Sequence, residues 1–198
     1  MSTAIATKTQ YSPEDLLNMP DSKSYELVDG QLVERKMGIE SSWVATQLIS
    51  LLNPFCRENA IGWVLQADSG YQCFPHAPSL VRKADASFVR YGRFPGGVLP
   101  KGWSRVRPDL AVEVVSPNDT TYELGEKLED YKKAGVPLVW VIKPNSRTVW
   151  VMRGDGSVNH LSEDGELSGE DVIPGFRCSI REILPPREPA QGPQPNGA

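Results

Sequence analysis

The sequence predicts an α/β domain built on a mixed β-sheet. Three observations support this: three strand-like runs follow a predicted helix, a second helix follows the third run, and a continuously apolar fourth run comes next. Strands joined by short connections pair antiparallel, whereas a helical crossover brings the next strand back parallel. We therefore expect an antiparallel meander whose last connection passes through a helix.

The N-terminal part predicts a short helix and a β-hairpin. Residues 1–10 are expected to be a flexible terminus. Ser12 is a suitable N-cap, Pro13 suits the first helical position, and acidic residues follow in the first turn. The alternating runs KSYELV and QLVERK flank Asp29 and Gly30, a pair typical of a two-residue hairpin turn. We expect this hairpin to lie at the sheet edge or to form an outer flap.

Residues 41–58 are expected to form an amphipathic helix that packs on the sheet, with a bend or an end near Pro54. A long loop rich in Gly and Pro spans 91–108. Loops of this length are uncommon unless they bind something or move. The strand-like runs 62–74 and 80–90 precede this loop, and the run 110–115 follows it.

The second half of the chain predicts the crossover. A helix is expected over 120–134, with cap candidates at its start and Gly135 at its end. The whole arrangement predicts one domain over 11–184, followed by a disordered Pro/Gly-rich tail over 185–198. The remaining expected elements are strands at 138–142 and 147–152, then turns and short strands over 155–183.

Composition excludes several classes of protein. Two histidines are too few for His-rich zinc sites, and three irregularly spaced cysteines indicate free thiols. The common phosphate-binding glycine motifs and G-x-S-x-G do not occur. No apolar stretch is long enough to span a membrane and no signal peptide is evident, so we expect a cytoplasmic protein. Any chemistry would then rest on carboxylates and lysine.

Charge is unevenly distributed along the chain. The net charge is −4, but the stretch 82–107 carries seven Lys and Arg side chains against the single carboxylate of Asp85. Aromatic residues lie among these bases, so the stretch could attract a polyanion and stack on unpaired bases. A solvated loop without a specific role explains the pattern equally well. The candidate nucleic-acid-binding residues are Arg90, Arg93, Lys101, Arg105 and Arg107.

One carboxylate is expected to be buried. The run LAVEVV is nearly continuously apolar, as in strands buried on both faces, and carries Glu113 at its centre. A buried carboxylate is costly unless it is paired, protonated or bound to a metal. In the second helix, Lys127 falls on the apolar face defined by Leu124 and Tyr131. The pair is either part of a functional site or a buried ion pair without catalysis.

A second carboxylate is expected to approach the first. Asp85 lies inside a strand-like run, and if that strand neighbours the strand of Glu113, the carboxylates face each other roughly 5 Å apart. Two convergent carboxylates suit Mg²⁺, which prefers oxygen ligands and keeps several waters. Asp109 shares the face of Glu113 but lies about 13 Å away along the strand, unless the backbone bends at Pro108.

These features together resemble a known family. Five stretches occur in the family's order between residues 11 and 184: YELVDGQLVE, KADASFV, RPDLAVEVVSPND, EKLEDYKKAGVPLVWVIKP with RTVWVMR, and DVIPGFRCSI. In combination they resemble the Uma-type restriction-endonuclease-like proteins, members of the PD-(D/E)XK nuclease superfamily. The resemblance implies a restriction-endonuclease-like fold, a mixed β-sheet flanked by helices with an αβββαβ core and an N-terminal β-hairpin.

The resemblance also implies the site residues. Asp85 and Glu113 would bind a Mg²⁺ or Mn²⁺ ion, with Asp109 as a further acid of the Pro-Asp motif. Lys127 would position the attacking water and offset charge in the transition state. Because this role is electrostatic, we expect the loss of Lys127 to lower the rate more than it disturbs folding.

The chain departs from the family pattern at two places. The parent superfamily has a lysine two residues after the glutamate, where this chain has Val115; the related family supplies the lysine from the next helix, which implies Lys127. A histidine expected after Glu40 is replaced by Ser41, and Glu40 is kept as an extra candidate ligand. The other acids of this part, Glu26 and Glu34, are expected at the surface.

The predicted function is that of a metal-dependent endonuclease that hydrolyses DNA phosphodiester bonds. The main alternative is a nuclease fold without turnover that binds nucleic acid or protein. A third interpretation is a phosphodiesterase for a small nucleotide, which would need a pocket rather than a groove. Nucleases of this fold that cut both strands often dimerise, so a homodimer stays an open alternative, although no sequence feature marks an interface.

Overall fold

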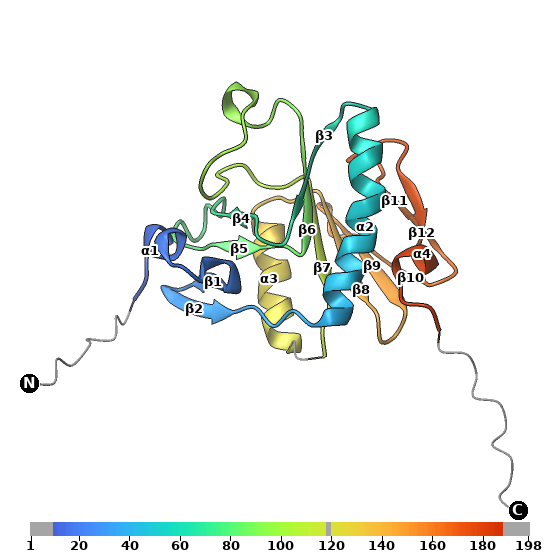
Figure 1. Ribbon diagram of the computed structural model, residues 1–198, viewed down its shortest axis with the longest axis horizontal. Helices are drawn as coiled ribbons and strands as arrows, with labels where there is room; N and C mark the ends of the chain where they lie inside the picture. The colour runs from blue at the N-terminus through green and yellow to red at the C-terminus, as the bar shows by residue number, and fades with distance from the viewer. Residues whose placement is uncertain (1–9, 118–119, 188–198) are drawn as a thin grey trace, which may run out of the picture.

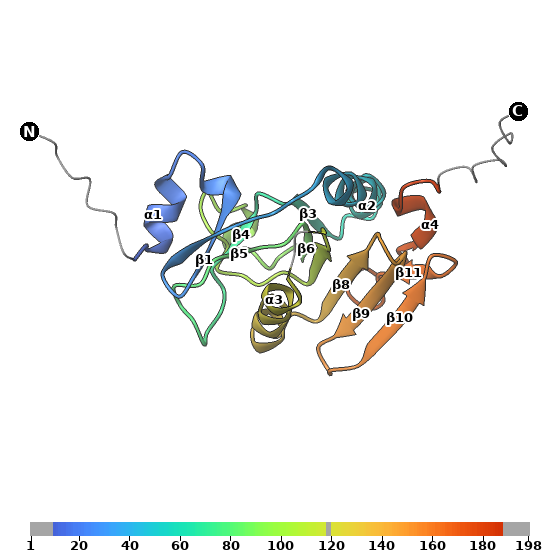
Figure 2. The same cartoon turned by 90° about the horizontal axis from the view of Figure 1, so that it is seen from below.

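The computed structural model describes residues 10–117 and 120–187 (Figures 1 and 2). Residues 1–9 of the expected flexible N-terminus and residues 188–198 of the expected disordered tail lie outside the described residues. Residues 185–187 of that expected tail belong to the described structure. Arg147 donates to the carbonyl of Pro185 (2.9 Å), and Arg187 pairs with Glu163.

A six-stranded mixed sheet forms the centre of the molecule, in the order β10-β9-β8-β7-β6-β3. All neighbouring strands pair antiparallel except β7 and β8, which are parallel and are connected through helix α3 (Thr121–Lys133). The predicted meander with one helical crossover is therefore confirmed. The strands are β3 (Gly62–Gln66), β6 (Ala86–Arg90), β7 (Leu110–Val114), β8 (Leu138–Lys143), β9 (Thr148–Arg153) and β10 (Val158–Ser162).

Helices cover both faces of this sheet (Figure 2). Helix α2 (Ile39–Glu58) and the short α4 (Ile180–Ile183) lie on one face, where Trp140 and Phe88 belong to the larger core. Helix α3 lies on the other face and packs through Tyr131. The helix predicted over 41–58 is confirmed; of the bend or end expected near Pro54, the end is wrong, because α2 continues through the exposed Pro54 to Glu58.

The predicted hairpin consists of β1 (Tyr25–Val28) and β2 (Gln31–Glu34), with positive φ at Asp29 and Gly30. It forms a separate small sheet, and Leu27 exchanges backbone hydrogen bonds of 3.0 and 2.9 Å with Val81. The hairpin is thereby attached across the strand run that precedes β6. This attachment places one face of β1 against the centre of the protein.

Two of the predicted strand runs are interrupted. The run 62–74 turns after β3 and resumes as β4 (Gly70–Tyr71), and the run 80–90 is divided into β5 (Arg82–Lys83) and β6. Asp85 lies at the second interruption. The other short elements are α1 (Pro13–Asn18), two 3₁₀ turns (Ser22–Ser24 and Pro95–Gly97), β11 (Glu166–Ser168) and β12 (Arg177–Ser179).

The long loop 91–108 is attached to the body of the protein by residues near the C-terminal end of the loop. Trp103 donates its indole N–H to the carbonyl of Pro13 (2.8 Å), and its ring lies where a Cβ on Gly70 would stand. Ser104 exchanges backbone hydrogen bonds with Gly70 and Gln72, each 2.8 Å long. The loop enters β7 at its N-terminal end, at the top of Figure 1.

Two further predictions concern the whole chain. All three cysteines are free, as expected from their spacing. Within 10–117 and 120–187, no helix is both long and apolar enough to cross a membrane.

Candidate functional site

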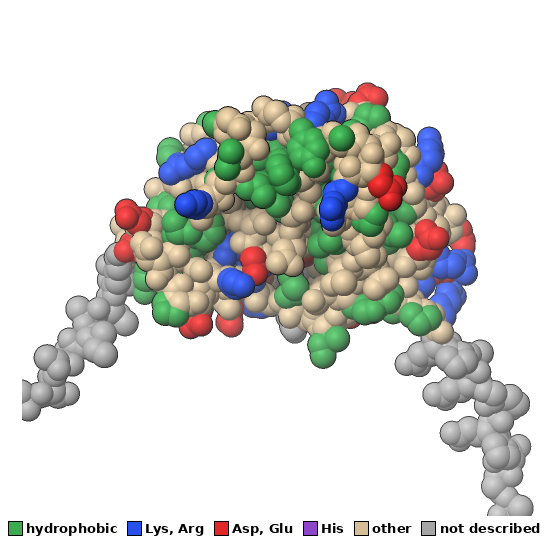
Figure 3. Space-filling model, turned by 45° about the horizontal axis from the view of Figure 1, so that its top comes forward, with side chains coloured by type: hydrophobic (Ala, Val, Ile, Leu, Met, Phe, Trp, Pro, Cys, Tyr) green, Lys and Arg blue, Asp and Glu red, His purple; other side chains and the backbone are tan. Residues whose placement is uncertain are grey.

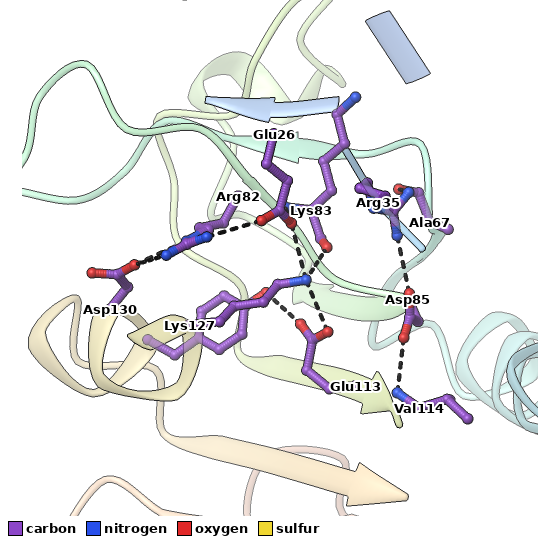
Figure 4. A network of polar contacts seen from close by, with 11 residues as sticks. Glu26, Arg35, Ala67, Arg82, Lys83, Asp85, Glu113, Val114, Lys127 and Asp130 are labelled. Carbon is purple, nitrogen blue, oxygen red and sulfur yellow. Dashed lines mark hydrogen bonds and ion pairs between the residues drawn. The ribbon is translucent and has the colours of Figure 1, made fainter. Parts of the chain in front are cut away.

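Asp85 and Glu113 come together where β6 and β7 begin to separate. Ala86 pairs with Val112, so continuing this antiparallel register by one residue places Asp85 opposite Glu113. The backbone N–H of Val114 donates to Asp85 Oδ2 (2.8 Å), and that of Asp85 donates to the Val112 carbonyl (2.9 Å). Asp85 and Glu113 therefore lie on neighbouring strands, as expected (Figure 4).

Lys127 reaches the same place from helix α3. Its ammonium lies 2.9 Å from Glu113 Oε2 and 2.9 Å from Glu26 Oε1, and it donates to the Lys83 carbonyl (2.7 Å). The side chain is only 13% exposed. The helical spacing that placed this lysine on the apolar face of α3 thus predicted its position correctly.

Glu26 is the member of this group that sequence reasoning missed. It is 4% exposed, although it was expected at the surface of the hairpin, so that expectation is wrong. The N–H of Lys83 donates to its Oε1 (2.7 Å), and Arg82 donates to its Oε2 (3.1 Å). The available signal was its setting between Tyr25 and Leu27, because a lone carboxylate in an apolar run is the same pattern that singled out Glu113.

Further polar side chains hold these groups in place. Tyr131 donates its hydroxyl to Glu113 Oε1 (2.7 Å), and Arg35 lies 3.0 Å from Asp85 Oδ1. Arg82 is also paired with Asp130, 2.7 Å away. Arg82 and Lys83 were counted in the basic stretch, but both are buried: Arg82 lies against this site, whereas the Lys83 ammonium lies away from it, near the Ser22 carbonyl and the Trp103 ring.

The three carboxylates differ in how burial and charge act on them. Burial raises the pKa of Glu113 to about 7. The attraction of Lys127 lowers this pKa, but repulsion from Asp85 and Glu26 partly offsets that attraction. The pKa of Asp85 is also raised, chiefly by burial. Burial acts on Glu26 as well, but Lys127 and Arg82 outweigh it and lower the pKa of Glu26.

Lys127 stays charged among these groups. Burial alone would lower the pKa of its ammonium, but the charges of Glu113, Glu26 and Asp85 outweigh this and raise it. The cluster of three carboxylates therefore favours a positive charge at this place.

The group lies at the floor of a cavity of about 370 Å³. The hairpin and the segment 35–37 form one wall, and the first turns of α3 form the other. Lys36 and Glu123 approach each other to 3.4 Å across these walls. The charged lining residues comprise six carboxylates and four cations: Glu26, Glu34, Asp85, Glu113, Glu123, Glu126, Arg35, Lys36, Arg82 and Lys127.

Asp109 does not join this group. Its carboxylate lies at the N-terminal end of β7, 2.7 Å from Arg93 and 3.6 Å from Arg107, and it accepts from the N–H of Arg90 (2.9 Å). The interpretation of Asp109 as a ligand beside Glu113 is not supported by this geometry. The backbone does not bend at Pro108 enough to overcome the length of β7.

Glu40 is also outside the group. It lies exposed in the first turn of α2 and does not line the cavity. The neighbouring Ser41 does line it, and its hydroxyl accepts from the N–H of Gly38 (3.0 Å) at the start of the helix. The residue in the place of the expected histidine therefore serves as a helix cap.

Three of the predicted nucleic-acid-binding residues, Arg90, Arg93 and Arg107, contact Asp109 at the N-terminal end of β7. Arg93 and Arg107 are paired with Asp109, and Arg90 donates to the carbonyls of Asp171 and Val172. On the face shown in Figure 3, the Lys and Arg side chains are scattered among hydrophobic and acidic ones. The remaining two candidates, Lys101 and Arg105, are exposed.

Within the described part of the chain, no group of three or more His, Cys, Asp or Glu side chains is arranged to hold a metal ion. Lys127 lies between Glu26 and Glu113, which explains why these carboxylates form no ready cage. Mg²⁺ needs no such cage, because one or two carboxylates with water and substrate phosphates suffice. Asp85 and Glu113 supply two hard oxygen ligands in a cavity with an excess of carboxylates, so they fit this ion.

A six-stranded mixed sheet with helices on both faces, and acids at the end of neighbouring central strands, defines the restriction-endonuclease-like class. Residues 13–181 match the model of the Uma2 family, whose description is "Putative restriction endonuclease", and the chain belongs to this family.

A solved structure has the same fold. It is the crystal structure described as "a putative nuclease belonging to DUF820 from Anabaena variabilis ATCC 29413", with a TM-score of 0.74 and 17% sequence identity. The similarity covers 87% of this chain and 97% of that one. At this identity the likeness shows the fold. No curated protein matches the chain.

Proposed function

We propose that this chain is a metal-dependent nuclease that hydrolyses DNA phosphodiester bonds at the cavity floored by Asp85 and Glu113. The observation that carries the proposal is the convergence of these two carboxylates with the ammonium of Lys127, 2.9 Å from Glu113, in a cavity open to solvent. Membership of a family described as putative restriction endonucleases supports the same reaction class.

Asp85 and Glu113 would hold the metal, Mg²⁺ or Mn²⁺. When bound, the ion supplies positive charge to a phosphoryl oxygen and lowers the pKa of a bound water. The backbone N–H of Val114 fixes the Asp85 carboxylate, and the hydroxyl of Tyr131 fixes that of Glu113. Two oxygens are thereby oriented in advance, which limits the reorganisation that binding requires.

Lys127 would place its charged ammonium beside the scissile phosphate. There it can hold a water by hydrogen bonding and offset the negative charge that develops during hydrolysis. Glu26 acts through Lys127 as a positioning residue, because it holds the ammonium from the side opposite Glu113 and keeps it charged.

The test is cleavage of labelled single-stranded DNA and supercoiled plasmid with Mg²⁺ or Mn²⁺. Wild type is compared with Glu113→Gln and with Asp109→Asn, a matched loss of one carboxylate charge on the same strand. We expect metal-dependent cleavage that falls by about 10²- to 10³-fold in Glu113→Gln and persists in Asp109→Asn.

The inactive binding module is the alternative, and one observation favours it: Lys127 joins Glu26 and Glu113 in a closed ion cluster that a purely structural role would also produce. Absence of cleavage by wild type on both substrates, together with DNA binding that persists in EDTA, would reject the nuclease in favour of that module.

A further inference from the structure

In the described part of the chain, the reactive groups of the proposed nuclease line the cavity and are otherwise almost completely buried. Glu113 is 5% exposed, and the side chains of Asp85 and Lys127 are each 13% exposed. A phosphate must therefore enter the cavity to touch them. The cavity volume, about 370 Å³, is near the lower end of the roughly 300–1,000 Å³ of small-molecule sites, so it accommodates about one nucleotide.

The mouth of the cavity is narrowed by contacts between its walls. Lys36 on one side and Glu123 on the other approach to 3.4 Å. The segment that carries Lys36 is held to the end of β7, because Ser116 donates its hydroxyl to the Lys36 carbonyl (2.9 Å). A whole nucleotide enters such a cavity more readily when it is unpaired, because taking a paired one out of a duplex costs unstacking and unpairing energy.

The charge of the lining also argues against a duplex. Binding a duplex through its backbone requires many Lys and Arg contacts to phosphates. The cavity lining is instead net acidic. The exposed Lys101 and Arg105 lie on the part of loop 91–108 that is attached beside α1 and β4, and neither belongs to the lining. Among the described lining residues, the cations are paired with carboxylates and form no basic track for a duplex backbone.

Much of the remaining lining is apolar. Tyr122, at the rim, is 73% exposed and belongs to the lining of the cavity. An exposed aromatic ring beside a phosphate site suits stacking on a nucleobase, a contact that every base can make. The aliphatic and thioether lining residues are Val28, Val33, Met37, Val114, Val115 and Leu124.

We infer that the substrate is a nucleic-acid strand with an unpaired nucleotide, whose base lies against Tyr122 and the apolar lining while its phosphate meets Asp85 and Glu113. This inference rests on the proposed nuclease function and names its substrate class. A duplex would be cut only where a nucleotide is already unpaired, as in an overhang, a flap or a frayed end.

The experiment uses one labelled oligonucleotide in three forms: as a single strand, as a blunt duplex, and as a duplex with a single-stranded overhang. Each is incubated with the full chain and Mn²⁺, and kcat/KM is measured. We expect the single strand and the overhang to be cut at least about tenfold faster than the blunt duplex. Equal or faster cutting within the blunt duplex would overturn the inference and leave the nuclease function standing.

Tyr122 supplies the second test. Tyr122→Ala is expected to raise KM for the single strand by about tenfold, as loss of one stacked base predicts, with kcat little changed. Tyr122→Phe keeps the ring and should restore KM. Tyr91→Ala, which removes another exposed tyrosine just beyond the C-terminal end of β6, is the matched control and should leave KM unchanged. An unchanged KM in Tyr122→Ala would remove the ring from the substrate site and contradict the inference.

The two proposals fail in different ways. Absence of metal-dependent cutting on all three forms would reject the nuclease function and, with it, this substrate class. Cutting that depends on Glu113 but does not distinguish the single strand from the duplex would reject the substrate class alone.

Discussion

The two ends of strand β7 each hold a buried carboxylate near cations, yet they are built differently. At the N-terminal end, Asp109 has one backbone N–H and two arginines as partners, with no other carboxylate among its described partners. At the C-terminal end, Glu113 shares one lysine with Glu26 and lies beside Asp85. The first end holds a single carboxylate between two arginines, whereas the second gathers three buried carboxylates around Lys127, with Arg35 and Arg82 beside them.

This difference separates a structural carboxylate from a candidate reactive one. A carboxylate paired by two arginines fastens a loop to a strand and has little reason to bind another cation. Carboxylates that repel one another in a buried cavity have raised pKa values and gain from a further positive charge. Burial alone therefore does not distinguish the two ends; the balance of charges does.

The largest expected effect on the cleavage rate comes from removing Lys127, and it is compared with the removal of Arg93 at the other end of β7. Lys127→Met should lower kcat by about 10²-fold or more, and Arg93→Met should leave kcat nearly unchanged. Steady-state cleavage of a single-stranded substrate measures both. Similar losses in the two variants would show that the ends of β7 do not differ in function.

Lys127→Met should also destabilise the fold, contrary to the expectation from sequence that the rate would suffer more than folding. Removing one partner of a buried ion pair typically costs about 3–5 kcal/mol, because charge is left uncompensated. The Arg93 side chain is 34% exposed, and its loss should cost about 1 kcal/mol or less. Urea unfolding of both variants measures the difference.

Glu26→Gln is expected to have the next largest effect. It keeps the shape of the side chain but weakens its hold on Lys127, so kcat should fall by about 10- to 100-fold, as for other groups that orient a reactive residue. KM should change little, because Glu26 lies behind Lys127. A normal kcat together with reduced stability would assign Glu26 a structural role only.

The dependence of stability on pH should also differ between the ends. The folded protein, free of metal, holds a proton on Glu113 up to a pKa of about 7, whereas the ordinary value is 4.5. Between these values the folded state binds more protons than the unfolded state, so the free energy of unfolding falls as pH rises from 4.5 to 7. The fall should be on the order of a few kcal/mol.

Glu113→Gln should flatten this slope, and Asp109→Asn should leave it in place. Urea unfolding in EDTA at several pH values between 4 and 8 measures all three proteins. A slope that is unchanged in Glu113→Gln would show that another group titrates in this range.

The smallest effect is expected from Asp109→Asn itself. The variant keeps the size of the side chain but weakens its contacts with Arg93 and Arg107. We expect a loss of about 1–3 kcal/mol in the free energy of unfolding, with the cleavage rate of the folded protein unchanged. A loss of activity that matches Glu113→Gln would bring Asp109 back as a functional acid.

Most of the fold could be predicted because its signals are local. The Ser12 and Thr120 caps, the Asp29-Gly30 turn and the apolar face of α3 each depend on a few neighbouring residues. The approach of Asp85 to Glu113 followed from two strands being neighbours, and Lys127 followed from helical spacing.

The missed features depend on contacts between distant segments. Glu26 is buried because Leu27 pairs with Val81, far along the chain, and hairpin periodicity cannot show that pairing. The same docking buries Arg82 beside Glu26, so a count of bases overstated the exposed charge. The partners of Asp109 depend on how the long loop folds back, which no local pattern specifies.

The most direct test of the difference between the ends is a calorimetric titration of the full chain with Mn²⁺. Wild type and Asp109→Asn should bind the ion with similar affinity, and Glu113→Gln should bind at least about tenfold more weakly. Equal affinity in wild type and Glu113→Gln, or a loss confined to Asp109→Asn, would contradict the assignment of the metal to the C-terminal end of β7.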